Sequence, residues 1–219
     1  MYYAFFDVDE TLITFKSMSS FLKYFYKIKY GSIGIILYYK FTILMRLFHY
    51  IGVKREKLNK NYYKKYKGYF EEEIKCIGSR WFSEYKNKNF YNEPILKELY
   101  RHLDSGAKIV LVSGSFSPCL IPIANDLGIE HVLCTNLEII QGKYTGNIIE
   151  NPIIGKGKSY AIRKFLEDKK ADSFSEYFAY GDHISDLYML SIVGKPYIIS
   201  GDIRLEKIAL DKGWKIIKK

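Results

Sequence analysis

The sequence predicts an α/β fold, namely a doubly wound, mostly parallel, Rossmann-like sheet with an inserted helical cap and a small β-hairpin. Three observations lead to this prediction. Short apolar runs alternate with helical stretches over most of the chain, several of these runs end abruptly at polar residues, and one long segment near the N-terminus lacks strand punctuation. With 219 residues, 48% of them apolar, the chain can bury a full core.

Each predicted strand is a short apolar run. Residues 2–6 form an aromatic run that ends at Asp7, and residues 108–112 form a β-branched run that ends at Ser113. The same pattern repeats at 131–135, 177–180, 196–200 and 215–217, with helical stretches at 117–127, 157–169, 184–193 and 203–212. Strands that alternate with helices predict a sheet covered by helices on both faces.

Residues 137–149 interrupt this alternation. Gln141, Gly142 and Lys143 separate two runs that can pair as an antiparallel hairpin. We expect this hairpin at the edge of the sheet.

A second interruption, the segment 15–92, is predicted to be an inserted helical cap. It reads as three or four helices, with breaks near Gly31, Gly52, Gly68 and Gly78. Residues 1–14 and 93–219 would then form the core domain.

Positive charge is concentrated in the cap. Residues 13–95 hold 17 Lys and Arg against 6 Asp and Glu, a net charge of +11, while the whole chain carries +10. The stretch 33–51 is apolar enough to raise the question of a membrane span. Such a span needs about 20 uninterrupted apolar residues, and here the run is interrupted by Lys40, Arg46 and His49. We therefore do not expect a transmembrane helix.

The cysteines and the N-terminus indicate the compartment. The three cysteines show neither a CxxC pair nor a zinc-binding spacing with the four histidines, so we expect reduced thiols at Cys76, Cys119 and Cys134. The first nine residues lack a basic leader and a cleavage site. Both observations predict a cytoplasmic location.

Two carboxylates follow the first predicted strand directly. Asp7 and Asp9 emerge at its carboxyl end, where open α/β sheets bind their ligands. They could serve as a nucleophile and an acid/base, or they could belong to a polar loop in which Thr11 caps a helix. Alone, this motif leaves both interpretations open.

Two further loops could bind an anion. Ser113, Gly114 and Ser115 follow the second strand and offer a hydroxyl and backbone amides at the start of a helix. Lys156 and Lys158 alternate with glycines before the next predicted helix, without the spacing of a P-loop. Taken singly, the first loop is better explained as a helix cap, and either lysine as a solvated side chain.

A fourth loop carries two more acids. Asp182 follows the strand at 177–180, and Asp186 lies one helical turn later. Two carboxylates at this spacing suit a hard cation, although an N-terminal helix cap has the same appearance. His183 is expected to be a loop residue, because no second histidine or cysteine stands at a zinc-binding spacing.

Together, these four loops resemble the motifs of the haloacid dehalogenase superfamily, in the phosphoserine-phosphatase-like branch that inserts a helical cap between its first and second motifs. Residues 7–11 resemble the first motif, 112–115 the second, the lysine before Ser159 the third, and 181–186 the fourth. Residues 135–138 and 142–146 also look like this branch. Glu10 stands where the superfamily more often has glycine.

The resemblance implies a phosphatase that hydrolyses a phosphate monoester through a phosphoaspartate at Asp7, with Asp9 as general acid and base. Mg²⁺ would be held by the side chains of Asp7 and Asp182 and the backbone carbonyl of Asp9, with Asp186 in a supporting role. Phosphate would be bound by Thr11, Ser113 and Gly114.

Either lysine could be the motif lysine. In similar sequences it is commonly followed, four positions later, by a buried aliphatic residue. Lys158 has Ile162 at that position, whereas Lys156 has Tyr160. The pattern favours Lys158 as the catalytic lysine.

The substrate is expected to be a phosphorylated, anionic small molecule other than phosphoserine. In amino-acid phosphatases of the branch, an acidic residue shortly after the first motif helps to hold the substrate ammonium. This chain has Lys16 in that neighbourhood.

Two other functions compete with this interpretation. The basic, aromatic cap could lie on an anionic membrane surface and admit a lipid phosphate, as in helical-cap relatives that act on phosphatidylglycerophosphate. Against this, the aromatic residues could simply form the core of the cap while the lysines solvate it. A non-enzymatic module that binds nucleic acid is disfavoured, because the acidic set is complete and no nucleic-acid motif accompanies the charge. The oligomeric state stays open.

Overall fold

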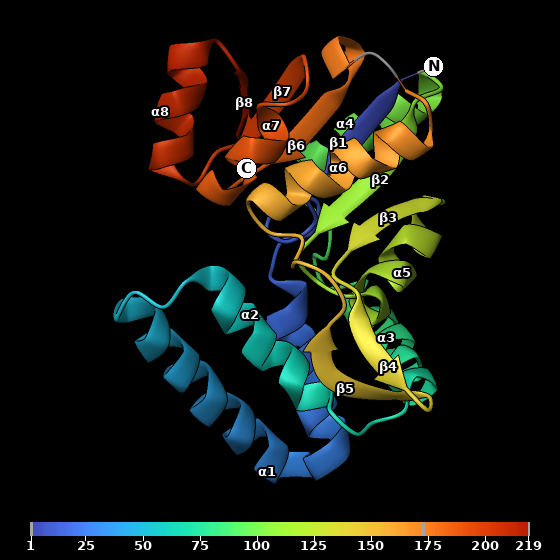
Figure 1. Ribbon diagram of the computed structural model, residues 1–219, viewed down its shortest axis with the longest axis vertical. Coiled ribbons are helices and arrows are strands. Elements are labelled where there is room, and N and C mark those ends of the chain that lie inside the picture. Colours follow the sequence, from blue (N-terminus) through green and yellow to red (C-terminus); the bar gives the residue numbers. More distant parts are fainter. Residues whose placement is uncertain (1, 172–173, 219) are drawn as a thin grey trace.

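The computed structural model describes residues 2–171 and 174–218, apart from the side chains of residues 55 and 56, and in this part of the chain six strands form one sheet (Figure 1). All neighbouring strands in it are parallel. Their order in the sheet is β3-β2-β1-β6-β7-β8. The six strands are β1 (Tyr3–Phe6), β2 (Lys108–Ser113), β3 (His131–Cys134), β6 (Phe178–Gly181), β7 (Lys195–Ile199) and β8 (Lys215–Ile217). The predicted α/β class and parallel sheet are confirmed.

The strand order reverses between β1 and β6. From β1 the chain adds β2 and β3 on one side, and it later adds β6, β7 and β8 on the other. Such a switch point opens a crevice at the carboxyl ends of the strands, where α/β sheets bind ligands. Phe6 and Tyr180 face each other in adjacent strands, with their rings stacked at a centroid distance of 4.3 Å.

Alternate residues of the central strands enter two different apolar clusters. In β1, Phe6 joins the cluster with α4 (Glu93–Asp104) and α5 (Ser117–Asp126), whereas Phe5 joins the other cluster. The second cluster contains α6 (Lys156–Asp168), α7 (Leu187–Leu190) and α8 (Ile203–Lys212). Because successive side chains of a strand point to opposite faces, helices cover both faces of the sheet, as predicted. Two short 3₁₀ turns, Phe174–Glu176 and Ile184–Asp186, flank β6.

The segment that we propose as the cap, residues 15–92, contains α1 (Ser17–Tyr50), α2 (Arg55–Tyr63), the 3₁₀ turn Lys64–Tyr66 and α3 (Glu71–Tyr85). It lies below the sheet in Figure 1. Its interior is aromatic, because the fully or almost fully buried side chains there include Phe21, Phe25, Tyr66 and Trp81.

The predicted glycine breaks have different outcomes. Gly31 kinks α1, with a φ of 57° and a ψ of −136°, and Gly52 follows the end of that helix. Gly78, in contrast, lies inside α3, so the predicted break there is wrong. A Cβ atom at this position would come within 2.1 Å of the carbonyl oxygen of Pro118, and glycine is needed for α3 to approach α5.

The hairpin forms, but its predicted place is wrong. Strands β4 (Leu137–Ile140) and β5 (Lys143–Ile148) pair with each other as a separate two-stranded sheet. The hairpin lies beside the cap in Figure 1, and its backbone is hydrogen-bonded to residues 68–71, around the start of α3. The N–H of Gly68 donates to Tyr144 O at 2.8 Å, and the N–H of Glu71 donates to Gly142 O at 2.9 Å. Backbone groups of the cap, rather than the main sheet, therefore form hydrogen bonds with the edge of the hairpin.

Candidate active site

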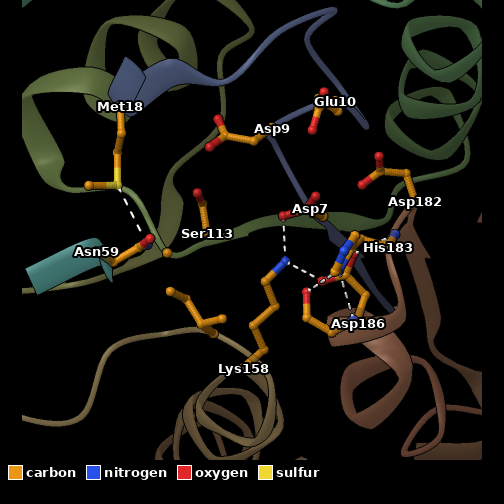
Figure 2. A pocket seen from close by; sticks show the side chains of 13 residues that line it. Asp7, Asp9, Glu10, Met18, Asn59, Ser113, Lys158, Asp182, His183 and Asp186 are labelled. Atoms are coloured by element: carbon orange, nitrogen blue, oxygen red, sulfur yellow. Dashed lines mark hydrogen bonds and ion pairs between the residues drawn. The ribbon is translucent and has the colours of Figure 1, made fainter. Parts of the chain in front are cut away.

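The site lies at the carboxyl ends of three adjacent strands. Asp7 follows β1, Ser113 ends β2, and Asp182 follows β6. The N–H of Asp7 donates to Tyr180 O at 2.9 Å, which continues the pairing of β1 with β6 one residue beyond the strand. Segments that are distant in the sequence thus bring their polar side chains to one pocket, as Figure 2 shows.

Asp7 is buried and forms an ion pair with Lys158 (Figure 2). Lys158 Nζ donates to Asp7 Oδ1 and also to Asp186 Oδ1, the latter at 2.7 Å. Lys158 is only 4% exposed and comes from the first turn of α6. Lys156 lies on the surface, with its Nζ 5.6 Å from the ring centroid of Tyr188.

The electrostatics of this cluster are dominated by burial and by an excess of acid. Burial raises the pKa of Asp7 to about 8; the ammonium of Lys158 opposes this shift, and the carboxylates of Asp186 and Asp182 add to it. Burial alone would lower the pKa of Lys158, but Asp186 and Asp7 raise it above its usual value. Lys158 therefore pairs with two buried carboxylates, and the partly exposed Asp182 adds a third acidic group near Asp7.

The acidic side chains fit a divalent cation. One carboxylate oxygen each from Asp7, Asp182 and Asp186 lie within 4.8 Å of one another. Thr11 Oγ1 lies 3.0 Å from Asp7 Oδ2 and 3.1 Å from Asp182 Oδ1, so that its hydroxyl helps to orient both carboxylates. An all-oxygen set with excess negative charge suits a hard cation such as Mg²⁺.

Asp9 lines the same pocket and is held by the cap. The N–H of Ser17 donates to Asp9 Oδ1 at 2.9 Å, and Ser17 Oγ donates to Ser115 Oγ at 3.0 Å. Ser17 is the first residue of α1. This contact joins the loop after β1, the loop after β2 and the cap.

The loop after β2 is closely packed. A Cβ atom on Gly114 would lie 2.5 Å from Ile154 Cγ1, so only glycine fits without displacing that side chain. The carbonyl oxygen of Gly114 accepts hydrogen bonds from Tyr63 Oη of the cap and from Thr135 Oγ1, the latter at 3.2 Å. Ser113 Oγ accepts from the N–H of Ser115 at 3.0 Å, which orients the hydroxyl group beside the pocket.

The cap contributes two pocket residues that the sequence analysis missed. Met18 of α1 and Asn59 of α2 line the pocket, and Asn59 Nδ2 lies 3.8 Å from Met18 Sδ (Figure 2). No sequence signal identifies them, because the cap helices carry no motif and helical periodicity does not reveal which face meets the sheet.

Two other pocket residues, Glu10 and His183, have defined local roles. Glu10 has a positive φ of 61°, and its Oε2 lies 3.2 Å from Lys16 Nζ. His183 caps the 3₁₀ turn before α7: its Nδ1 accepts from the N–H of Ser185 at 3.0 Å, while its own N–H donates to Asp186 Oδ2 at 3.2 Å. This capping arrangement, rather than metal binding, explains the position of His183 and helps to fix Asp186.

Comparison with known proteins supplies the family. Residues 4–191 match the family model described as haloacid dehalogenase-like hydrolase. The chain belongs to this family. The predicted resemblance is therefore confirmed over most of the chain, including the segment that we propose as the cap.

Relatives of this hydrolase include proteins described as phosphatases. A histidinol-phosphatase of Neisseria meningitidis is 28% identical over 153 residues, which cover 68% of each protein. A phosphoserine phosphatase of Mycobacterium tuberculosis is 33% identical over 115 residues, which cover 52% of this chain and only 37% of the mycobacterial protein. An inhibition of morphological differentiation protein of Streptomyces azureus is 28% identical over 98% of this chain and 77% of its own length.

Solved structures of the same fold include a protein of unknown function from Bordetella pertussis Tohama I. It has a TM-score of 0.88 at 20% identity and covers 99% of this chain and 98% of its own. A phosphoserine phosphatase with an analogue of a phospho-aspartyl intermediate has a TM-score of 0.65 at 16% identity, over 98% of this chain and 91% of its own. At these identities the likeness supports the fold of the hydrolase.

Proposed function

We propose that this hydrolase is a Mg²⁺-dependent phosphatase that cleaves a phosphate monoester of an anionic small molecule other than phosphoserine. The observation that carries the proposal is the environment of Asp7, a buried carboxylate at the carboxyl end of β1 that is ion-paired with Lys158 and lies among the other acids of the pocket. The relatives named as phosphatases support the same reaction class.

The metal would be held by the side chains of Asp7 and Asp182 and by the backbone carbonyl of Asp9. When bound, the ion supplies positive charge that offsets the repulsion between Asp7 and an incoming phosphate dianion. Asp186 would support the site indirectly, because it holds Lys158.

In the first half of the reaction, a carboxylate oxygen of Asp7 attacks phosphorus and the bond from phosphorus to the leaving oxygen breaks. Asp9 gives its proton to that oxygen, so that an alcohol departs. In the second half, Asp9 takes a proton from water, the water oxygen attacks phosphorus, and the acyl-phosphate bond to Asp7 breaks. Phosphate is released and both aspartates return to their initial states.

The anion-binding residues would act on the oxygens that are neither attacking nor leaving. The hydroxyl of Ser113, the N–H of Gly114 and the ammonium of Lys158 are donors to these oxygens. Thr11 was predicted to bind phosphate, and its buried hydroxyl lies against two carboxylates, so we assign it to the orientation of Asp7 and Asp182.

The preference for an anionic substrate rests on Glu10, Lys16 and the charge of the cap. Glu10 lines the pocket, but Lys16 lies beside it, so this pair offers little net negative charge to a substrate ammonium. The net charge of +11 over residues 13–95 favours substrates that carry negative charge beyond the scissile phosphate.

A lipid phosphate as substrate gains no support from the site. Many aromatic residues of the cap are buried, whereas Tyr39 and Tyr50 are exposed, and the named relatives do not bear on lipids. A cytoplasmic small-molecule phosphatase is our proposal, and a nucleic-acid module without catalysis is disfavoured by the assembled acids of the pocket.

The test is turnover of an aryl and an alkyl phosphate by the wild-type protein and by Asp7→Asn and Asp9→Asn. We expect Asp7→Asn to lose at least about a thousandfold in kcat, because an amide cannot attack phosphorus. Asp9→Asn should lose more activity on the alkyl ester, whose leaving group needs protonation. EDTA should abolish turnover, Mg²⁺ should restore it, and Ca²⁺ should inhibit, because its larger and looser coordination would relax the geometry. Wild-type turnover by Asp7→Asn in Mg²⁺ would refute the nucleophile.

A further inference from the structure

The second half of α1, after the kink at Gly31, presents a row of apolar side chains to solvent. One face of this half packs against α2, where Phe41 and Met45 are buried and the ring of Phe41 lies 4.8 Å from that of Tyr62. On the opposite face, side chains at helical spacing are each 44–71% exposed. We call these residues the outer stripe: Ile33, Ile36, Ile43, Leu44, Leu47 and Ile51.

The outer stripe is unusual for a helix at the surface of a soluble domain. The exposed side of a surface helix is normally polar, whereas here it carries the outer stripe beside Lys40, Arg46 and His49. Its most apolar window of 18 residues has a mean hydropathy of 1.3, yet only 17% of that window is buried. Single exposed apolar residues are common, but a row of six along one helix face, interrupted by Lys40, indicates an interaction surface.

The contacts at the start of α1 and at the end of α2 argue against a helix that crosses a membrane. The first residue of α1, Ser17, is bonded to Asp9 in the loop after β1. Tyr63, which ends α2 on the far side of the helical hairpin, donates to the carbonyl oxygen of Gly114 in the loop after β2. Both ends of the hairpin therefore meet the same pocket. If the second half of α1 crossed a bilayer, α2, with nine residues, would be too short to return the chain to that pocket. A helix that lies along a surface preserves both contacts.

The positive charge of the helical hairpin, formed by the second half of α1 and α2, favours an anionic surface as the partner of the outer stripe. Residues 32–67 hold nine Lys and Arg against one Glu. Lys40 lies on the exposed side of α1, and a row of lysines lines a groove along α2, at Lys54, Lys57, Lys60 and Lys64. Anionic headgroups attract such a cluster, each lysine near the surface contributing about 1 kcal/mol. A second copy of the chain would bring the same positive charge and be repelled.

We propose that the outer stripe docks on an anionic lipid bilayer, with the second half of α1 lying in the plane of the interface. Apolar side chains would enter the boundary between headgroups and acyl chains, and the exposed Lys40 and Arg46 of α1 would contact the headgroups, while the α2 lysines on the other side of α1 add a longer-range attraction. Figure 1 shows this half of α1 at the periphery of the molecule, with α2 between it and the sheet. The proposal does not depend on the phosphatase activity or on a lipid substrate.

Co-sedimentation with vesicles tests the proposal. We expect the full chain to bind vesicles that contain phosphatidylglycerol and to bind vesicles of phosphatidylcholine much more weakly. The double variant Ile43→Gln/Leu47→Gln should partition into the phosphatidylglycerol vesicles at least about tenfold more weakly, because it removes two apolar side chains from the contact. The matched control is Ile203→Gln/Leu210→Gln on α8, where the side chains are 82% and 71% exposed. This control should bind as the wild-type protein does.

Circular dichroism and turnover of a soluble phosphate ester report whether each variant is folded, independently of vesicle binding. Equal binding by the stripe variant and the wild-type protein would overturn the proposal, as would equal binding to both types of vesicle. Absence of vesicle binding together with a concentration-dependent dimer, lost in the stripe variant, would identify a second copy as the occupant and also overturn it.

Discussion

The backbone N–H of Ser17 donates a hydrogen bond to Oδ1 of Asp9 at a distance of 2.9 Å. Ser17 begins α1, so the residue that starts the long helix of the cap also holds the proposed general acid. Its hydroxyl makes a separate bond to Ser115 Oγ. The position of the cap is thus coupled to the orientation of Asp9, and the hydroxyl bond can be removed while the N–H bond is kept.

We expect Ser17→Pro to lower kcat about tenfold to a hundredfold on an alkyl phosphate. Proline removes both the N–H that holds Asp9 and the hydroxyl that bonds Ser115, while its fixed φ suits the first position of a helix. Ser17→Ala keeps the N–H and loses only the hydroxyl, so it should stay near the wild-type kcat. Equal losses in the two variants would assign the effect to the hydroxyl instead.

Lys158 and Lys156 allow a matched comparison within one helical turn. Lys158→Gln should lose at least about a hundredfold in kcat, because it removes a preorganised cation from the phosphate site. It should also lower the thermal unfolding temperature of the metal-free protein, since Asp7 and Asp186 lose their buried partner. Lys156→Gln, on the surface, should change neither quantity. Steady-state kinetics and thermal unfolding in EDTA check this pair, and a larger defect in Lys156→Gln would reverse the assignment.

Lys16 is expected to control the preference for substrate charge. Lys16→Glu should lower KM for ammonium-bearing phosphates and raise it for polyanionic ones, because it adds a carboxylate beside Glu10 at the pocket. Lys88→Glu makes the same charge change on an exposed cap lysine near Glu84 and serves as the control. Higher ionic strength should raise KM for a polyanionic substrate in the wild-type protein, because exposed charges are screened over about 8 Å at physiological salt. Identical KM changes in the two variants would show that only total charge matters.

His102 gives the fold a dependence on pH. It is fully buried, its Nδ1 lies 3.0 Å from Tyr2 Oη and its Nε2 lies 2.8 Å from Tyr180 Oη. Burial, with help from Arg101 and against Glu98, lowers the pKa of His102 from 6.5 to about 4. The unfolded chain therefore binds a proton below pH 6.5 that the folded state refuses until about pH 4.

The contribution of His102 to stability is thus present above pH 6.5 and is lost as the pH falls towards 4. The free energy of unfolding should decrease over this window by up to about 3 kcal/mol from this group. Urea unfolding of wild-type protein and His102→Gln at pH 7 and pH 4.5 measures the difference. The variant should be less stable at pH 7 and show a shallower pH slope. An unchanged slope would contradict the neutral, buried imidazole.

Much of the fold follows from local patterns. The run at 215–217 coincides with β8, and the other predicted strands agree with the observed ones to within one residue at either end. Short buried strands are easy to recognise because they are apolar, β-branched or aromatic, and bounded by polar residues. The predicted helix at 184–193 is shorter than expected, because a 3₁₀ turn capped by His183 precedes α7.

The grouping of the polar loops also follows from the sequence. Once the strands are parallel, their carboxyl ends lie at one edge of the sheet, so Asp7, Ser113 and Asp182 are expected at that edge, and they meet because β2, β1 and β6 are neighbours. The roles of these residues stay proposals, but their place at one edge of the sheet needed only the alternation of strands and loops. The hairpin of β4 and β5 was also predicted from a local signal, its turn. The element that it packs against was not predicted.

Only the tertiary structure decided which surfaces meet. It placed Asn59 and Met18 in the pocket and set the hairpin against the cap. It also left the outer stripe of α1 uncovered. The sequence by itself determined the strands, the polar loops and the apolar character of these helices. Helical and strand periodicity states which side chains share a face, but the neighbour of that face is fixed by packing between segments far apart in the chain, and local patterns do not encode that choice.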